Sequence, residues 1–528
     1  MTTLLLNGRV HSPAMPDATA IAVSDGIVAW LGSDDIGRQQ FPDAQIVDLD
    51  GGFVAPAFVD SHVHLTATGL TLAGLDLRNA TSLRHCLSLI VEYARAHPDG
   101  PIWAHGWDES GWPERMTPST EDLDGVIGDR PAYLARVDVH SAAASTALHR
   151  LAPGLAEAAG FDPRHPLTSD AHHLVRAAVR EQLTADQRQH ARRAALDSAA
   201  AFGIVAVHEC AGPNIGGLDD WQEIRGVEHG VEVVGYWGES VTSAQEAREL
   251  IDATGADGLA GDLFVDGALG SRTAWLHDPY TDAPDCFGNS YLDVDAVTAH
   301  LMACTEAGIT AGFHVIGDAA VTTVVDALTR VADTFGVPRL ARCGHRLEHL
   351  EMVTPEQAGV LGSLGVFASM QPNFDALWGG DDGMYAQRLG PDRVHQLNPL
   401  ALLASQGVPL AFGSDSPVTG MDPWSTVHAA TRHRTRGSAV SARAAFAAAT
   451  RGAWRAGGVN DGVTGTLVPG APASYAVWEA DAFEVSAPAD AVQRWSTDRS
   501  SRVPALPRLD GRLPRCRQTV HRGVAIHG

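Results

Sequence analysis

An apolar run over residues 53–65 that ends in His62-Val63-His64 limits the folds open to this chain. The run is preceded by glycine and rich in β-branched and aromatic residues, which predicts a buried strand. Residues two apart on a strand point to the same side, so we expect His62 and His64 to project together. Two imidazoles on one face suit Zn²⁺ or another transition metal. Because the chain has 24 histidines, such a pair also arises by coincidence, and partners elsewhere must support it.

Length and charge restrict the class of protein. A chain of 528 residues is expected to form two to four folding units, or one barrel with additions. Its 45% hydrophobic and 19% charged residues are typical of a globular protein, and neither a secretory leader nor a membrane-length apolar run is visible. The formal net charge of −25 argues against nucleic acid or an anionic membrane as a partner. We expect a small-molecule substrate, and a homo-oligomer stays open.

Cysteine and lysine usage adds two constraints. The six cysteines are scattered without paired spacing, which predicts a protein of the reducing cytoplasm rather than a disulfide framework or a cysteine-rich zinc site. All 38 basic residues are arginines, and the sequence contains no lysine. Any site that depends on a lysine side chain is therefore excluded.

Short alternating segments at both ends of the chain predict a small β unit. At the N-terminus, residues 1–52 hold four such segments separated by turn residues: 4–6, 20–23, 28–31 and 45–47. Within residues 456–528, three further segments have β character: 465–472, 474–478 and 520–526. We expect the C-terminal segments to return to the N-terminal β unit, which packs at the edge of a larger domain.

The middle of the chain predicts a (β/α)₈ barrel with an insertion. From about residue 201 to 455, short apolar strands alternate with helical patterns, which is typical of βα units around a parallel sheet. Seven strands are expected at 204–208, 231–236, 262–266, 310–314, 346–350, 366–369 and 409–413. Residues 53–59 supply the first strand and complete the eight of such a barrel. Residues 66–200 then form an α/β insertion between strands one and two, with helices at 82–96 and 174–199 and strands at 102–106 and 132–137.

Side chains suited to metal binding or acid–base chemistry stand at the predicted carboxyl ends of six strands, where barrel active sites lie. They are His62 and His64 on strand one, His208 and Glu209 on strand two, Asp262 and Asp266 on strand four, His314 on strand five, His349 on strand six and Asp415 on strand eight. Singly, each has a structural alternative, such as a hydrogen-bonded core histidine or an aspartate that caps a helix. Together they predict one shared site.

Six motifs spread over almost the whole chain carry a family resemblance. They are Ala57-Phe58-Val59-Asp60-Ser61-His62-Val63-His64, Gly106-Trp107-Asp108-Glu109, Asp266-Gly267-Ala268-Leu269-Gly270-Ser271-Arg272-Thr273-Ala274, His314-Val315-Ile316-Gly317-Asp318, Arg346-Leu347-Glu348-His349 and Gly413-Ser414-Asp415-Ser416-Pro417-Val418. Their order resembles the amidohydrolase superfamily, and most of all the branch called amidohydrolase family 3 or YtcJ-like. The resemblance implies a TIM barrel with a β-sandwich and metal-dependent hydrolysis, usually of C–N bonds.

The chain departs from the family pattern at one metal-binding position. Many members with two metals bridge them with a carboxylated lysine, and in this branch the resemblance places that lysine at position 262, where this chain has Asp262. Asp262 could bind a metal directly or play an electrostatic or packing role, and Glu209 could also bridge. We expect one tightly held divalent metal, Zn²⁺ by preference, and leave a second, weaker metal open. The expected ligands are His62, His64, His314 and Asp415, or a subset of them with His349.

The expected mechanism follows from these ligands. A divalent metal lowers the pKa of its water from 15.7 toward about 7. Asp415 would take a proton from that water and pass it to the leaving nitrogen. His349 or His208 would polarise the substrate carbonyl and stabilise the oxyanion.

Other residues are candidates for substrate contacts. Arg272 follows the fourth strand and could hold a substrate carboxylate, with a structural salt bridge as the alternative. Trp107 and Asp108 could line a pocket, with ordinary packing as the alternative. Asp138 and His140 fit a lid or supporting pair better than ligands. His172 is read as part of a solvated helix face, so we expect His172→Ala to be silent.

Three functions remain open on the sequence alone. The first is hydrolysis of a small N-acyl, N-formyl or cyclic amide. The second is deamination of a nitrogen heterocycle by the same metal site, which ammonia release would reveal. The third is a catalytically inactive barrel that binds a ligand, which a folded but metal-free preparation would favour.

Overall fold

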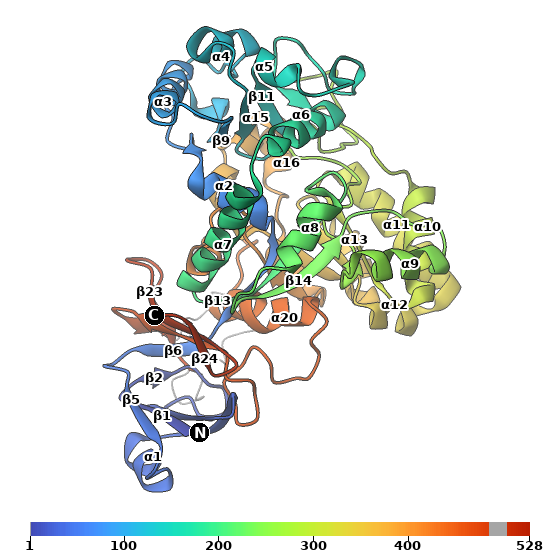
Figure 1. Cartoon of the computed structure of the whole chain (residues 1–528). Coiled ribbons are helices and arrows are strands. Elements are labelled where there is room, and N and C mark those ends of the chain that lie inside the picture. Colours follow the sequence, from blue (N-terminus) through green and yellow to red (C-terminus); the bar gives the residue numbers. More distant parts are fainter. Residues whose placement is uncertain (1, 485–503) are drawn as a thin grey trace.

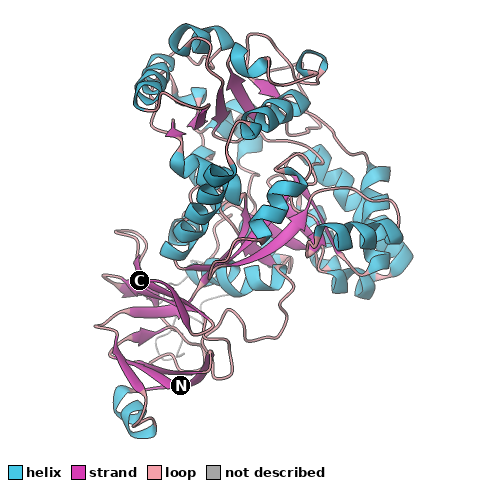
Figure 2. Cartoon of the chain, in the orientation of Figure 1, coloured by secondary structure: helices cyan, strands magenta, loops and turns pink. Residues whose placement is uncertain are grey.

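The computed structural model describes residues 2–484 and 504–528, which form three regions (Figure 1). A β-rich unit contains both chain ends, a barrel with surrounding helices occupies the middle, and an α/β region lies on the far side of the barrel from the chain ends. Figure 2 shows helices around the barrel strands and beside the sheet of the α/β region, whereas the β-rich unit with the chain ends has little helix. None of the helices in the described parts of the chain is long and apolar enough to cross a membrane.

The terminal β unit contains two main sheets, as predicted, and a short pair of strands, β21 (Phe483–Glu484) with β22 (Leu506–Pro507). One has the order β4-β3-β1-β5 and the other β2-β6-β20-β23-β24. The strands are β1 (Thr2–Leu6), β2 (Arg9–Val10), β3 (Ala20–Ser24), β4 (Ile27–Gly32), β5 (Gln45–Asp48), β6 (Phe53–Pro56), β20 (Tyr475–Glu479), β23 (Arg515–His521) and β24 (Val524–His527), with helix α1 (Asp34–Gln40) at one edge. Buried Leu5, Val10, Val54, Tyr475 and Val520 pack between the two sheets. The predicted strand at 465–472 was wrong, because this segment forms turns that pair with β4 only at an isolated bridge, Ile27 with Pro472.

The strand predicted at residues 53–59 divides between two sheets. β6 pairs antiparallel with β20 in the terminal unit, whereas β7 (Phe58–Val63) belongs to the barrel. Ala57 separates them and donates its backbone N–H to the Ser474 carbonyl, at 3.2 Å. The single apolar run is therefore buried in two different cores. The periodicity of the sequence alone could not show that it divides between two sheets.

Eight parallel strands form the barrel, in the order β19-β18-β17-β16-β15-β14-β13-β7. Besides β7 they are β13 (Ile204–Ala211), β14 (Glu232–Trp237), β15 (Gly258–Leu259), β16 (Thr310–Val315), β17 (Arg346–His349), β18 (Phe367–Met370) and β19 (Leu410–Phe412). The last strand returns to the first at their carboxyl ends, where the Asp415 N–H donates to the His62 carbonyl at 2.8 Å and the His64 N–H to the Ser416 carbonyl at 2.9 Å. The predicted barrel and its strand count are confirmed.

The fourth strand is displaced from its predicted position. It was expected at 262–266, but β15 covers Gly258–Leu259 and ends before a turn at Gly261, whose φ is +73°. Only glycine adopts this left-handed conformation without strain. Asp262 therefore lies in the loop after the strand, and Val265 and His314 continue the pairing through a 3.0 Å backbone hydrogen bond.

Helices pack around the barrel and over its loops (Figure 1). They are α8 (Gly217–Arg225), α9 (Ala244–Thr254), α10 (Val294–Ala307), α11 (Asp318–Phe335), α12 (Val337–Cys343), α13 (Pro355–Leu364), α14 (Pro372–Trp378), α15 (Met384–Leu389), α16 (Pro391–Val394), α17 (Leu400–Ser405), α18 (Pro423–Thr431), α19 (Ala442–Ala447) and α20 (Ala453–Ala456). Apolar faces of α10, α11 and α13 join the barrel strands in one continuous core.

The insertion has its own sheet, in the order β12-β11-β10-β9-β8. Its elements are β8 (Leu75–Asp76), β9 (Ile102–Trp107), β10 (Ala132–Arg136), β11 (Ser141–Ala144), β12 (Leu167–Thr168), α3 (Leu83–Ala96), α4 (Thr120–Ile127), α5 (Thr146–His149) and α6 (Ser169–Glu181). Helices α2 (Leu65–Ala73) and α7 (Ala185–Ala201) connect it to the barrel. The helix predicted at 174–199 is two helices, because Thr184 caps α7 and forms a reciprocal capping box with Gln187.

Candidate active site

Six side chains meet at the carboxyl ends of the barrel strands. They come from β7 and the residue after it (His62, His64), from the loop after β15 (Asp262), from β16 (His314), from the end of β17 (His349) and from the turn after β19 (Asp415). Five of the six were predicted as ligands, and Asp262 was left open. The parallel strands explain the meeting, because their ends share one edge of the sheet.

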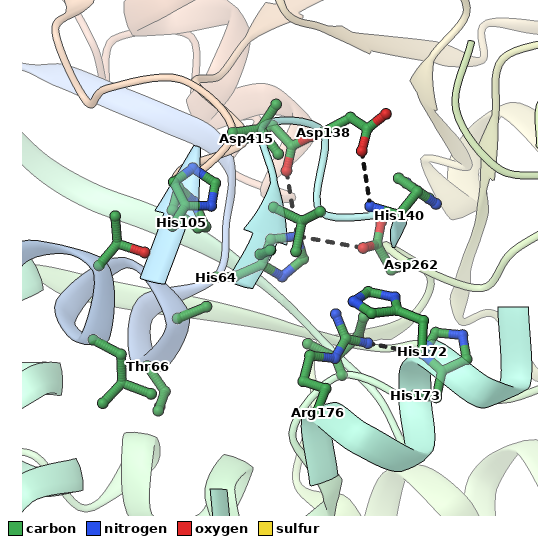
Figure 3. A pocket seen from close by; sticks show the side chains of 18 of the residues that line it. His64, Thr66, His105, Asp138, His140, His172, His173, Arg176, Asp262 and Asp415 are labelled. Carbon is green, nitrogen blue, oxygen red and sulfur yellow. Dashed lines mark hydrogen bonds and ion pairs between the residues drawn. The ribbon is translucent and has the colours of Figure 1, made fainter. Parts of the chain in front are cut away.

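Asp262 and Asp415 lie between the imidazoles. His62 Nε2 is 3.4 Å from Asp262 Oδ1 and 3.5 Å from Asp415 Oδ1. His64 Nε2 is 3.3 Å from an oxygen of each carboxylate, a placement visible in Figure 3. His314 Nδ1 lies 3.7 Å from Asp262 Oδ1. Asp262 thus contacts three histidines at once.

His349 completes the cluster from the sixth strand. Its ring centroid is 4.4 Å from that of His314 and 5.0 Å from that of His62. Its backbone φ is +73°, an uncommon value for a residue with a side chain. A strained backbone conformation of this kind persists only where the surrounding structure enforces it, and such conformations are typical of functional sites.

Neighbouring groups hold three of these imidazoles by their other nitrogen. The pairs are His62 Nδ1 with Glu348 Oε2 at 2.9 Å, His314 Nε2 with the Gly267 carbonyl at 3.2 Å and His349 Nδ1 with Gln371 Oε1 at 2.7 Å. Metal-binding histidines are typically oriented in this way. The inward nitrogen of each ring is left to face the cluster.

The inward atoms lack hydrogen-bond partners among the described residues. His62 Nε2, Asp262 Oδ1, His314 Nδ1 and His349 Nε2 are buried and form no hydrogen bond. Buried polar atoms are nearly always satisfied, so four such atoms facing one cluster require an explanation. Ligand atoms of His62, His64 and Asp262 lie within 4.8 Å of one another, and so do those of Asp262, His314 and His349. The residues present therefore fit one or two divalent cations with Asp262 at the shared position.

The neighbouring imidazoles lower the pKa of both carboxylates. Burial alone would raise the pKa of Asp262, but His62, His64 and His314 hold it well below its usual range. Asp415 behaves alike, because His62 and His64 outweigh burial and lower its pKa. The cluster accordingly offers anionic oxygen and imidazole nitrogen, the donor set of zinc and related metals.

A cavity opens from the cluster toward the insertion (Figure 3). His64, Asp262, His314 and Asp415 form its barrel side. The opposite side comes from the insertion and from loops, and includes Trp103, Tyr133, His172, His173, Arg176, Phe264 and Tyr291. The insertion thus supplies much of the surface that a substrate would contact.

The predicted solvent exposure of His172 was wrong. Its side chain is only 2% exposed, and its Nε2 is hydrogen-bonded to the Tyr133 hydroxyl at 2.8 Å. The sequence did indicate this burial, because His172 shares a helix face with Val175 and Val179, which are both fully buried. That periodicity would have placed His172 and Arg176 on the inner face of α6.

The three predicted substrate contacts have other partners in the structure, and none lines this cavity. Arg272 forms a bidentate pair with Asp282, at 3.0 and 2.7 Å. Trp107 is fully buried in the insertion core and donates its indole N–H to the Leu134 carbonyl. Asp108 accepts a hydrogen bond from Arg136 at 2.9 Å.

His208 also has a partner away from the cavity. Its Nδ1 accepts a hydrogen bond from Arg346 at 2.9 Å, and burial, together with Arg346, lowers its pKa well below the usual value. Glu209 does line the cavity, accepts the Leu65 N–H at 2.7 Å and has a pKa raised to about 7 by burial. Asp138 and His140 line it too, with Asp138 held by Arg136 at 2.8 Å.

Comparison with known proteins agrees with the geometry. Residues 45–527 match the model of the Amidohydrolase family. The chain belongs to this family. It is 27% identical over 435 residues to the putative amidohydrolase YtcJ of Bacillus subtilis, covering 76% of this chain and 78% of the relative. This amidohydrolase is also 23% identical over 442 residues to an N-substituted formamide deformylase of Arthrobacter pascens, covering 77% and 78%.

A solved structure extends the likeness to the fold. The crystal structure of an uncharacterized metal-dependent hydrolase from Pyrococcus furiosus superposes with a TM-score of 0.70 at 27% identity, covering 91% of this chain and 99% of the other. The chain is therefore an amidohydrolase-family, metal-dependent hydrolase acting on C–N bonds.

Proposed function

We propose that this amidohydrolase cleaves the amide bond of a small N-acyl or N-formyl compound in the cavity between barrel and insertion. The observation that carries the proposal is the cluster of nitrogen and oxygen atoms around Asp262 that are buried without hydrogen bonds among the described residues. The similarity to a formamide deformylase supports an amide over other C–N substrates.

The cluster can hold cations in two adjoining places that share Asp262. His62, His64 and Asp262 offer one set of ligands, and Asp262, His314 and His349 offer the other. We favour zinc because the ligands combine imidazole with carboxylate. When bound, such a cation activates water for attack near neutral pH and polarises a carbonyl oxygen.

Asp415 is the proposed general base. It borders the cavity and lies 3.3 Å from His64 Nε2 and 3.5 Å from His62 Nε2, and these imidazoles lower its pKa. A carboxylate in this position accepts a proton from the attacking water and delivers it to the leaving nitrogen. His349 borders the adjoining space beside Asp415, so of the two imidazoles considered for polarising the carbonyl it is better placed than His208.

One experiment separates the three functions left open by the sequence. Protein purified without chelator is analysed for metal by mass spectrometry and screened against N-formyl and N-acyl amines, with amine and ammonia release both measured. Amine release by metal-loaded protein is the expected result. Ammonia from heterocycles alone would favour a deaminase, and folded, metal-free, inactive protein would favour a binding function.

The role of Asp415 is tested by Asp415→Asn. Removing the base is expected to lower kcat/KM by about 10²- to 10⁴-fold, the usual contribution of acid–base catalysis, with an unchanged far-UV circular dichroism spectrum. Asp129→Asn serves as the control, since Asp129 is 80% exposed and pairs with surface Arg150. Full activity in Asp415→Asn would remove this residue from the mechanism.

A further inference from the structure

We propose that Arg176 binds a carboxylate of the substrate, so that the preferred substrates are amides that carry an anionic group, such as N-acyl amino acids. The inference rests on the proposed amide hydrolysis and narrows it to a substrate class. It starts from the charges that border the cavity.

Arg176 extends from α6 into the cavity wall (Figure 3). One of its terminal nitrogens contacts His173 Nδ1 at 2.9 Å and donates to the Asn214 carbonyl at 2.5 Å. Its Nε is buried and has no hydrogen-bond partner among residues 2–484 and 504–528. Within the same ranges no carboxylate forms an ion pair with it. The guanidinium therefore keeps donor capacity for a ligand.

Other arginines near this site are neutralised. Arg180, one turn along α6, pairs with Asp220 at 2.8 Å, and Arg192 pairs with the same carboxylate at 2.7 Å. Arg136, beside the cavity, contacts Asp108, Glu109 and Asp138. Unlike these three arginines, Arg176 has no carboxylate partner among the described residues.

The half-buried Arg176 has no ion-pair partner among the described residues, and its Nε has no hydrogen bond. Moving a charge away from water is unfavourable in general, and cations inside proteins are normally paired. Burial lowers the pKa of Arg176 below its usual value, which reports the same cost. The neighbouring imidazoles do not compete for an anion, because burial lowers the pKa of His173 to about 3 and that of His172 well below its usual value. An anionic ligand would supply the missing partner.

The cavity also indicates what connects the carboxylate to the amide. Figure 3 places Arg176, His172 and His173 on the α6 side and His64, Asp262 and Asp415 on the barrel side. The lining of the cavity also includes aromatic or apolar side chains: Leu70, Trp103, Tyr133, Phe264 and Tyr291. A substrate with its amide at the metal cluster, its carboxylate at Arg176 and an apolar group against this lining satisfies all three surfaces.

The kinetic test uses matched substrates and variants. Wild type, Arg176→Met and Arg176→Lys are assayed on N-benzoylglycine and on N-ethylbenzamide, which lacks the carboxylate. Arg176→Met is expected to lower kcat/KM on N-benzoylglycine by about 10- to 100-fold, as for a lost charge-assisted hydrogen bond, and by less than 3-fold on N-ethylbenzamide. Arg176→Lys is expected to restore part of the loss. Arg330→Met is the control, since Arg330 is 50% exposed on α11 and pairs with Asp295.

The position of the carboxylate is tested in the same assay. N-benzoylglycine carries it on the amine side of the scissile bond, whereas the monoanilide of succinic acid carries it on the acyl side. If hydrolysis of N-benzoylglycine depends on Arg176, the preferred substrate is an N-acyl amino acid. If hydrolysis of the succinic acid monoanilide depends on it, the preferred substrate is the amide of a dicarboxylic acid. Equal losses on charged and neutral substrates would overturn the proposal.

Binding is measured independently of turnover. Isothermal titration of metal-loaded protein with 3-benzoylpropionate, in which a methylene group replaces the amide nitrogen, is compared with titration of neutral butyrophenone. Arg176→Met is expected to weaken 3-benzoylpropionate alone, by about 10- to 100-fold. If this holds while no amide is hydrolysed, the proposed function fails and carboxylate recognition stands. If amides are hydrolysed but both ligands bind the variant and wild type alike, carboxylate recognition fails.

Discussion

At the scale of single residues, the sequence predicted the members of the cluster better than their arrangement. His62, His64, His314, His349 and Asp415 could be expected to meet, because each lies at a strand end. Asp262 could not be assigned, since the sequence placed it at the start of a strand and the turn at Gly261 moves it past the strand end. Its contact with three histidines depends on that turn.

We expect Asp262→Ala to lose more than half of the bound metal. This carboxylate belongs to two of the sets of ligands at the cluster, so its removal weakens both of them. Metal content per chain, measured by mass spectrometry after gel filtration, gives the result. Asp295→Ala provides the comparison, because Asp295 is 86% exposed on α10. Unchanged metal content in Asp262→Ala would show that the histidines and Asp415 suffice.

We expect His172→Ala to destabilise the protein, contrary to the silence predicted from the sequence. The change leaves the buried Tyr133 hydroxyl without its 2.8 Å partner, at a cost of about 1–3 kcal/mol. Urea unfolding of His172→Ala, Tyr133→Phe and the double variant measures the coupling. Strictly additive effects of the two changes would exclude this hydrogen bond as the cause.

At the scale of elements, local signals located most helices and strands but not their long-range partners. The break between α6 and α7 was encoded in the capping box of Thr184 and Gln187 and could have been predicted. The division of residues 53–63 between β6 and β7 could not, because both halves are equally apolar and their sheets are completed by strands hundreds of residues away. The burial of α6 against the insertion sheet is likewise a tertiary effect.

We expect Gly69→Ala to be strongly destabilising because α2 packs directly on α7. A Cβ at Gly69 would lie 1.7 Å from the Ala191 carbonyl oxygen, so one helix must move. Overpacking of this kind costs about 1–3 kcal/mol, and α2 starts next to His64, so metal binding should weaken too. Gly125→Ala in α4 is the matched control, since its added Cβ would meet no atom within 4 Å from the described residues outside its own stretch of helix. Thermal unfolding of the two variants should differ, and equal melting temperatures would contradict the close packing.

At the scale of the whole molecule, the number of expected strands was sufficient to predict the barrel but not the residues that line the cavity. The eight-strand rhythm and the returning C-terminal strands predicted the architecture. Much of the cavity's remaining surface comes from the insertion, whose docking on the barrel follows from no local pattern. The motifs therefore led us to predict substrate contacts at Arg272, Trp107 and Asp108, but these side chains bind other protein groups outside the cavity lining.

We expect folding stability to fall as the pH drops below about 6.5. Two histidines outside the metal cluster are buried, and burial lowers the pKa of His11 and of His300 to about 4 each. Between pH 6.5 and 4 the unfolded chain binds protons that the folded chain does not, so stability rises with pH in this window and levels off above it.

Chemical unfolding from pH 4.5 to 7.5 measures this dependence. His300→Gln should reduce the slope, because one proton-linked site is removed from the buried region between α10 and β15. His395→Gln, at a side chain that is 51% exposed, should leave it unchanged. A slope identical in all three proteins would assign the acid sensitivity to other groups.

The aspartate at position 262 also has a consequence for how the centre is assembled. A carboxylated lysine forms only when carbon dioxide adds to an amine, and this chain has no lysine to receive it. Asp262 brings its carboxylate with the polypeptide at translation. Metal-free protein should therefore regain its full metal complement in degassed, bicarbonate-free buffer, at a rate that dissolved carbonate does not alter.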